Sequence, residues 1–224
     1  MSTIEADAVT AATGTNTALS LRGKGTGKVA LGDATLLWPD ADGGSSGDVL
    51  QTNGSGTLSF ATPGGGLTLG TMQTPTGTVA TFSGIPSGTK RITINMAGIS
   101  LDATASSYLR LRIGDAGGIE LGGYLGQVAR VNATDTDCES HYNDFELTVY
   151  AAHAALSYGT VVLTLMNAAT FQWACSSVLG RDPSNAVNIS GGTKTLSAEL
   201  TQLDLASGGG SGNFDAGTIN ITYE

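Results

Sequence analysis

The chain has 224 residues, of which 33 are glycine; 13% of its residues are charged and the formal net charge is −9. This acidic balance, without a run of Lys and Arg to neutralise phosphates, excludes nucleic acid as a partner. No apolar run is long enough to span a membrane, and residues 1–30 lack the basic start and apolar core of a signal peptide, so we expect folding in a cytoplasm. Cys138 and Cys175 are too few for a disulfide scaffold, and free thiols are expected.

Residues 1–20 form the first segment and alternate small residues with Ile4 and Val9. The pattern fits a strand and a short helix equally well. We expect an N-terminal arm here.

Residues 21–62 alternate short apolar clusters with turns rich in Gly, Asn and Ser, including the turn at 53–56. Strands this brief bury too little apolar surface to offset the entropy cost of ordering their backbone. We therefore expect several identical chains to wind around one axis and to share their apolar side chains in an interwoven shaft. The expected contacts between subunits are Leu36, Trp38, Val49, Leu50, Leu58 and Phe60.

Residues 63–78 contain three consecutive glycines and two prolines, which predicts a linker. Residues 79–224 follow it and show the period-two alternation of half-buried strands, separated by turn signals. This pattern predicts an all-β head domain, a sandwich of jelly-roll type. We also expect a β-bulge near residues 201–202, where the apolar phase changes. The alternation is clearest in residues 91–96, 109–113, 145–149, 171–175 and 218–223.

The segment 134–144, with the sequence TDTDCESHYND, is the densest polar constellation of the chain. Asp, His and Cys are all metal-ligand types, but their spacing matches no known zinc motif, so we predict no metal site. The favoured interpretation is a solvated connecting loop, and the alternative is a loop that contacts carbohydrate or protein. Tyr142 would offer a ring face to a sugar. The candidate receptor-binding residues are Asp135, Asp137, His141, Tyr142 and Asp144.

Three other side chains carry expectations. Trp173 shares one strand face with apolar neighbours and is predicted to lie in the core. Arg110 and Arg112 project from one face of a strand, where Asp115 or Glu120 are their expected partners.

Three segments of the head stand out, TFSGIPSGTKRITINMAGISLDATASSYLRLRIGDAGGIELGGYLG, YGTVVLTLMNAATFQWACSSVLG and FDAGTINITYE. In this order they resemble the terminal domain of tailed-bacteriophage fibre proteins. Residues 27–62 similarly resemble the shaft module of such fibres. The resemblance implies a homotrimeric, non-catalytic virion fibre whose C-terminal β-sandwich heads recognise a host surface glycan or outer-membrane component. It also implies that residues 1–20 bind a baseplate, tail or capsid protein of the virion.

Two alternatives to receptor binding stay open at this point. One is a structural role as a capsid head fibre or decoration protein. The other is a glycan-cleaving fibre, which needs two carboxylates facing each other across a groove. Nothing in the spacing of the Asp and Glu residues selects such a pair, so we expect neither enzymatic activity nor a cofactor.

Overall fold

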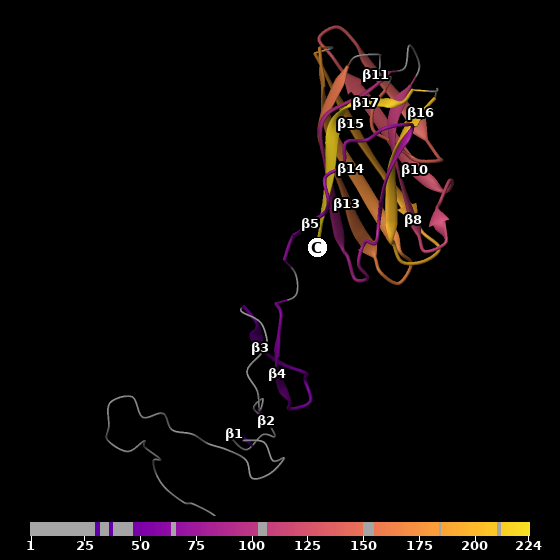
Figure 1. Ribbon diagram of the computed structural model, residues 1–224. Helices are drawn as coiled ribbons and strands as arrows, with labels where there is room; N and C mark the ends of the chain where they lie inside the picture. The colour runs from indigo at the N-terminus through magenta and orange to yellow at the C-terminus, as the bar shows by residue number, and fades with distance from the viewer. Residues whose placement is uncertain are drawn as a thin grey trace, which may run out of the picture. The chain divides into compact units, whose positions relative to one another are not determined.

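The computed structural model describes residues 30–31, 36–37, 47–63, 66–102, 107–149, 155–183, 185–209 and 212–224 (Figure 1). The chain divides into two compact units, residues 1–65 and 66–224. All regular structure in the described ranges is β-strand, which confirms the all-β prediction. The strands are β1 (Ala30–Leu31), β2 (Leu36–Leu37), β3 (Val49–Thr52), β4 (Leu58–Ala61), β5 (Thr68–Leu69), β6 (Val79–Ser83), β7 (Arg91–Leu101), β8 (Tyr108–Asp115), β9 (Gly118–Ile119), β10 (Tyr124–Val131), β11 (Thr136–His141), β12 (Phe145–Glu146), β13 (Leu156–Asn167), β14 (Gln172–Asp182), β15 (Ala186–Thr195), β16 (Gln202–Gly208) and β17 (Phe214–Tyr223).

The N-terminal unit contains two antiparallel pairs, β1 with β2 and β3 with β4. The predicted turn at 53–56 joins β3 to β4, and the Asn53 side-chain oxygen accepts the backbone N–H groups of Ser55 (2.8 Å) and Thr57 (3.1 Å). Of the predicted shaft contacts, Val49 and Leu50 are exposed, at 47% and 39%, whereas Leu58 is buried and Phe60 half-buried within a single copy. Residues 1–20, Trp38 and the side chain of Leu36 lie outside what the structure describes, and the trimeric shaft stays a prediction.

Two antiparallel sheets build the second unit. The larger has eight strands in the order β11-β10-β15-β14-β13-β7-β17-β5. The smaller has the order β12-β8-β16-β6, with β9 paired to β8. Long neighbouring strands such as β13, β14 and β15 give the large sheet its length (Figure 1).

The core lies between these two sheets, because each strand turns alternate side chains toward the other sheet. On β7, for example, Ile92 and Ile94 are fully buried while Arg91 and Thr93 alternate with them. Trp173 is 2% exposed, which confirms that it is a core residue. The core draws on both sheets, including Leu111, Ile113, Phe145, Leu203 and Leu205 from the small sheet and Ile92, Ile94, Leu163, Trp173 and Ile221 from the large one.

The predicted linker belongs to the head, which corrects the boundary at residue 78. β5 pairs with the last strand, β17, and Gly70 donates its N–H to the carbonyl of Ile221 at 2.8 Å. Gln73 exchanges two backbone hydrogen bonds with Ile219, at 2.8 and 2.9 Å. Gly70 lies so close to β17 that an added Cβ would be 2.9 Å from the Ile221 side chain. Glycine therefore lets this segment lie along the sheet edge, where we had predicted a break.

The structure supports the bulge predicted near residues 201–202. Gln202 pairs with Gly114 of β8, and Thr201 also donates its N–H to the Gly114 carbonyl at 3.1 Å, so two consecutive residues face one residue of β8. The rest of the register between β16 and β8 runs without a shift. Leu200 is buried ahead of the strand, and Leu203 is buried within it. The change of apolar phase between Leu200 and Leu203 coincides with this irregularity at the start of β16.

Candidate functional site

The polar segment predicted as a loop is an edge hairpin of the large sheet. β10 and β11 pair from Gly126 opposite His141 to Val131 opposite Thr136. At the turn, the Asn132 side-chain oxygen accepts the N–H groups of Thr134 (2.9 Å) and Asp135 (2.7 Å). Such an Asn-centred turn explains why polar residues here form a strand instead of a solvated loop.

Alternation along β11 gives the hairpin two different faces. Ser140 is exposed on one face, and Tyr142 follows it on the same face just beyond the strand. Glu139 and His141 are half-buried and lie on the other face. The backbone carbonyl of Tyr142 accepts the N–H of Tyr124 at 3.1 Å, which continues the pairing beyond the strand and fixes where the ring emerges.

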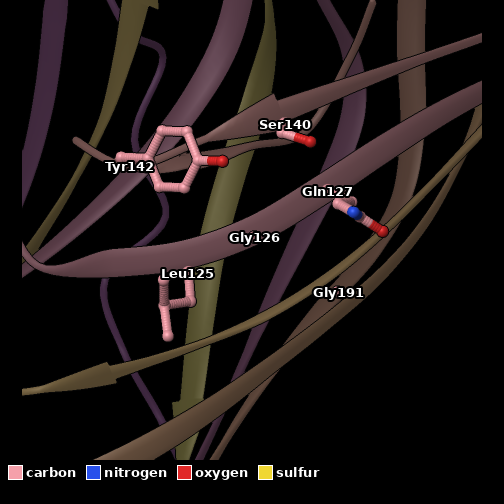
Figure 2. Close-up of a pocket in the computed structure, with 6 residues that line it drawn as sticks. All are labelled: Leu125, Gly126, Gln127, Ser140, Tyr142 and Gly191. Carbon is pink, nitrogen blue, oxygen red and sulfur yellow. The ribbon is translucent and has the colours of Figure 1, made fainter.

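The face that carries Ser140 and Tyr142 is hollowed into a pocket with a volume of about 370 Å³ (Figure 2). The Tyr142 ring and Leu125 lie at one end, with 63% and 64% of their surfaces exposed. The hydroxyl of Ser140 and the amide of Gln127 lie at the other end. The described lining residues are Leu125, Gly126, Gln127, Ser140, Tyr142 and Gly191.

The pocket exists because the strands bring these residues into register. Gln127 lies opposite both Ser140 on β11 and Gly191 on β15. Gly191 has no side chain, so the sheet surface beside Gln127 is left open. A ring face and an apolar side chain next to a hydroxyl and an amide suit a ligand that is apolar on one side and polar on the other, and a sugar ring has this character.

No charged side chain appears among the described residues that line this pocket. The chain as a whole carries a net charge of −9, which disfavours an anionic ligand. The pocket therefore suits an uncharged, hydroxyl-rich molecule.

Tyr124 anchors the beginning of β10 beneath the pocket. Its hydroxyl accepts the Ile113 N–H at 2.9 Å and donates to the Glu120 carbonyl at 3.0 Å. Its ring meets Phe145 edge to face, with centroids 4.9 Å apart. Burial raises the pKa of Tyr124, so the phenol stays neutral and keeps both bonds. These contacts join the hairpin to the small sheet.

A second group of polar side chains lies on the other face of β11. The Nε2 atom of His141 is 2.5 Å from the Oε2 of Glu146 and 3.7 Å from the Oε2 of Glu139. The Tyr108 ring is 5.8 Å from the His141 ring. Burial, then repulsion from Glu139 and Asp144, raises the pKa of Glu146 to about 8.

The five predicted receptor residues separate in the structure. Tyr142 alone lines the pocket; Asp135 is exposed at the hairpin turn, 3.7 Å from Arg130, and Asp137 is half-buried opposite Arg130. His141 belongs to the second polar group. Asp144 is only 2% exposed and lies 3.5 Å from Arg110, so it is withdrawn from any receptor-contacting surface.

The pairing expected for the two arginines was wrong. Arg110 lies beside Asp144, and Arg112 pairs with Asp204 on the neighbouring strand. Asp115 instead accepts hydrogen bonds from Ser197 and Gly117, and Glu120 binds Lys194.

The pocket residues Leu125, Gln127 and Gly191 were missed from the sequence. Residues 124–131 do not alternate in hydropathy, and no local signal shows that this strand lies between β11 and β15. Both cysteines are free, with Cys138 exposed on the hairpin and Cys175 buried.

Comparison of the chain with protein-family models, with curated proteins and with solved structures found no match in any of the three. The described residues include no helix long and apolar enough to cross a membrane. The fold and the pocket define a class, an all-β protein with a sandwich head and an open, uncharged pocket at a sheet edge.

Proposed function

We propose that the protein is a homotrimeric virion fibre of a tailed bacteriophage and that its sandwich heads attach the particle to a neutral host-surface sugar. Residues 1–20 would bind a baseplate, tail or capsid protein. The role is adhesive and non-catalytic. The observation that carries the proposal is the pocket beside Tyr142, an exposed aromatic ring next to uncharged hydrogen-bonding groups.

Two further observations support the fibre. The chain divides into a hairpin unit and a sandwich unit, as expected of a shaft followed by a head. The apolar side chains of Val49 and Leu50 are exposed in a single copy of the hairpin unit, and neighbouring copies of the chain would cover them. The resemblance of both units to phage fibre segments agrees with this division.

A glycan array probed with the labelled full-length protein tests the proposed ligand class. We expect binding to neutral glycans and a loss of about 1 kcal/mol, or ~5-fold in affinity, on Tyr142→Ala, because the stacking face is removed. Tyr158→Ala is the matched control, since Tyr158 is a 47% exposed tyrosine on β13 of the same sheet and lies outside the pocket lining. Equal binding by the two variants, or no glycan bound by the wild type, would refute the assignment.

A further inference from the structure

The polar group on the inner face of the β10–β11 hairpin has the composition of a metal site. Glu139 and His141 come from β11, and Glu146 comes from β12 at the edge of the other sheet. One ligand atom from each lies within 4.8 Å of the other two. We propose that these three side chains bind one divalent first-row transition-metal ion of the zinc type.

The contact between His141 and Glu146 argues for a shared ion. Their Nε2 and Oε2 atoms are 2.5 Å apart, close enough for an ion pair, yet neither atom has a partner with hydrogen-bond geometry among the described residues. The Glu146 side chain is 1% exposed and the His141 side chain is 17% exposed, so water does not replace that partner at Glu146. Two buried polar atoms that lie this close without hydrogen-bond geometry are placed to coordinate the same ion.

Distances in the cluster are close to those of a coordination shell. Zinc binds imidazole nitrogen and carboxylate oxygen at about 2.0–2.2 Å, so neighbouring ligand atoms around a tetrahedral ion are about 3.3 Å apart. The spacing of His141 from Glu139 is 3.7 Å, and its spacing from Glu146 is 2.5 Å. Small side-chain movements in opposite senses bring both to the required value.

Charge in the cluster also calls for a cation. Two carboxyl groups, those of Glu139 and Glu146, converge on the same imidazole nitrogen of His141. Arg110 lies 3.5 Å from Asp144, and its Nε atom has no partner within the described ranges. A divalent ion between Glu139 and Glu146 would balance their two charges.

The types of ligand indicate which class of ion binds, and the exposure of Glu139 shows where the ion enters. Calcium and magnesium favour shells made of oxygen atoms, whereas imidazole with carboxylates suits zinc and its neighbours. The Glu139 side chain is 38% exposed, so an ion enters from that side and a water molecule completes the shell there. The pocket lies on the other face of β11, so this inference does not depend on the proposed function.

Equilibrium dialysis of the full-length protein, prepared without a histidine tag, against zinc chloride tests the site. We expect one zinc ion per chain at micromolar free zinc, a higher melting temperature with zinc, and ~10-fold or more weaker binding in Glu139→Gln and Glu146→Gln. Glu139 is partly exposed, so its variant keeps the fold and remains informative if the Glu146 variant unfolds.

Glu199→Gln is the matched control, because Glu199 is a carboxylate held by Ser87 and Gly88 outside the cluster. It should bind zinc as the wild type does. No bound zinc in the wild type, or unchanged affinity in Glu139→Gln, would overturn the proposal.

Discussion

Arg112 and Asp204 face each other on neighbouring strands and form a two-pronged ion pair. The Nε and Nη2 atoms of Arg112 donate to the two carboxylate oxygens of Asp204 at 3.0 and 2.8 Å. Their side chains are 15% and 5% exposed, so solvent compensates little if one partner is lost. The pair joins β8 to β16 at the centre of the small sheet.

Replacing one member of this pair should destabilise the head. Asp204→Ala leaves a nearly buried guanidinium without its partner, and we expect the free energy of unfolding to fall by about 3 kcal/mol. Urea unfolding followed by circular dichroism measures this. The double variant R112L/D204L removes both charges and should lose clearly less than the single variant. An equal or greater loss in the double variant would show that the ion pair does not carry the effect.

Adjacent glycines on β15 should respond differently to alanine. At Gly192 an added Cβ would be 2.5 Å from the Leu125 carbonyl oxygen, and that backbone atom can move only if β10 moves. At Gly191 the nearest atom is the Cys175 oxygen at 3.7 Å, an ordinary contact. We expect Gly192→Ala to cost about 1–3 kcal/mol of stability and Gly191→Ala to cost much less.

The melting temperatures of the two alanine variants check this expectation. Gly191→Ala should also place a methyl group in the pocket and weaken glycan binding without loss of stability. A stable Gly192→Ala variant would mean that β10 and β15 do not pack as closely as described.

Acid should remove part of the stability that Ser197 provides. The Ser197 hydroxyl and the Gly117 N–H bind Asp115 and lower the pKa of its carboxyl below the ordinary value of 3.8. A carboxylate with a lowered pKa in the folded state stabilises the protein above its unfolded pKa, and this contribution is lost as the pH falls through the folded value. The hydroxyl's contribution is therefore complete at neutral pH and declines below about pH 3.8.

Ser197→Ala isolates this effect. The variant should melt at a lower temperature than the wild type at pH 7. This difference in melting temperature should narrow as the pH falls toward 3, because the Ser197 hydroxyl of the wild type stabilises the ionised carboxyl of Asp115 and not the protonated one. Thermal melts across this range give the comparison. The other titrating groups are the same in both proteins, so their effects on the difference in melting temperature cancel. A gap that stays constant with pH would contradict the role assigned to Asp115.

Strand content could be predicted from the sequence because half-buried strands alternate in hydropathy. Residues 91–96 do so clearly, and they lie in β7. Glycine and proline in residues 63–78 led to the prediction of a linker, because the pattern does not distinguish a linker from an extended segment that pairs at a sheet edge. The strand β5 and the contacts of Gly70 depend on pairing with β17, which is distant in sequence.

Much of the candidate site depends on pairings between distant strands. Tyr142 was selected from the sequence for its ring, but Gln127 and Gly191 join it only because β10 lies between β11 and β15. Similarly, His141 and Glu146 are close in sequence, yet nothing local shows that they belong to opposing sheets. The sequence showed which side chains could bind a ligand, but only the fold showed which of them lie together.

Sedimentation equilibrium of the full-length chain, compared with a shorter chain of residues 66–224, tests the proposal of a trimeric fibre most directly. The full chain should sediment at three times its mass of 22.5 kDa, because the N-terminal hairpins order only by sharing apolar side chains among copies. The shorter chain keeps β5 and the complete sandwich, and it should be folded and monomeric. A monomeric full-length chain with its hairpin unit folded would contradict the account.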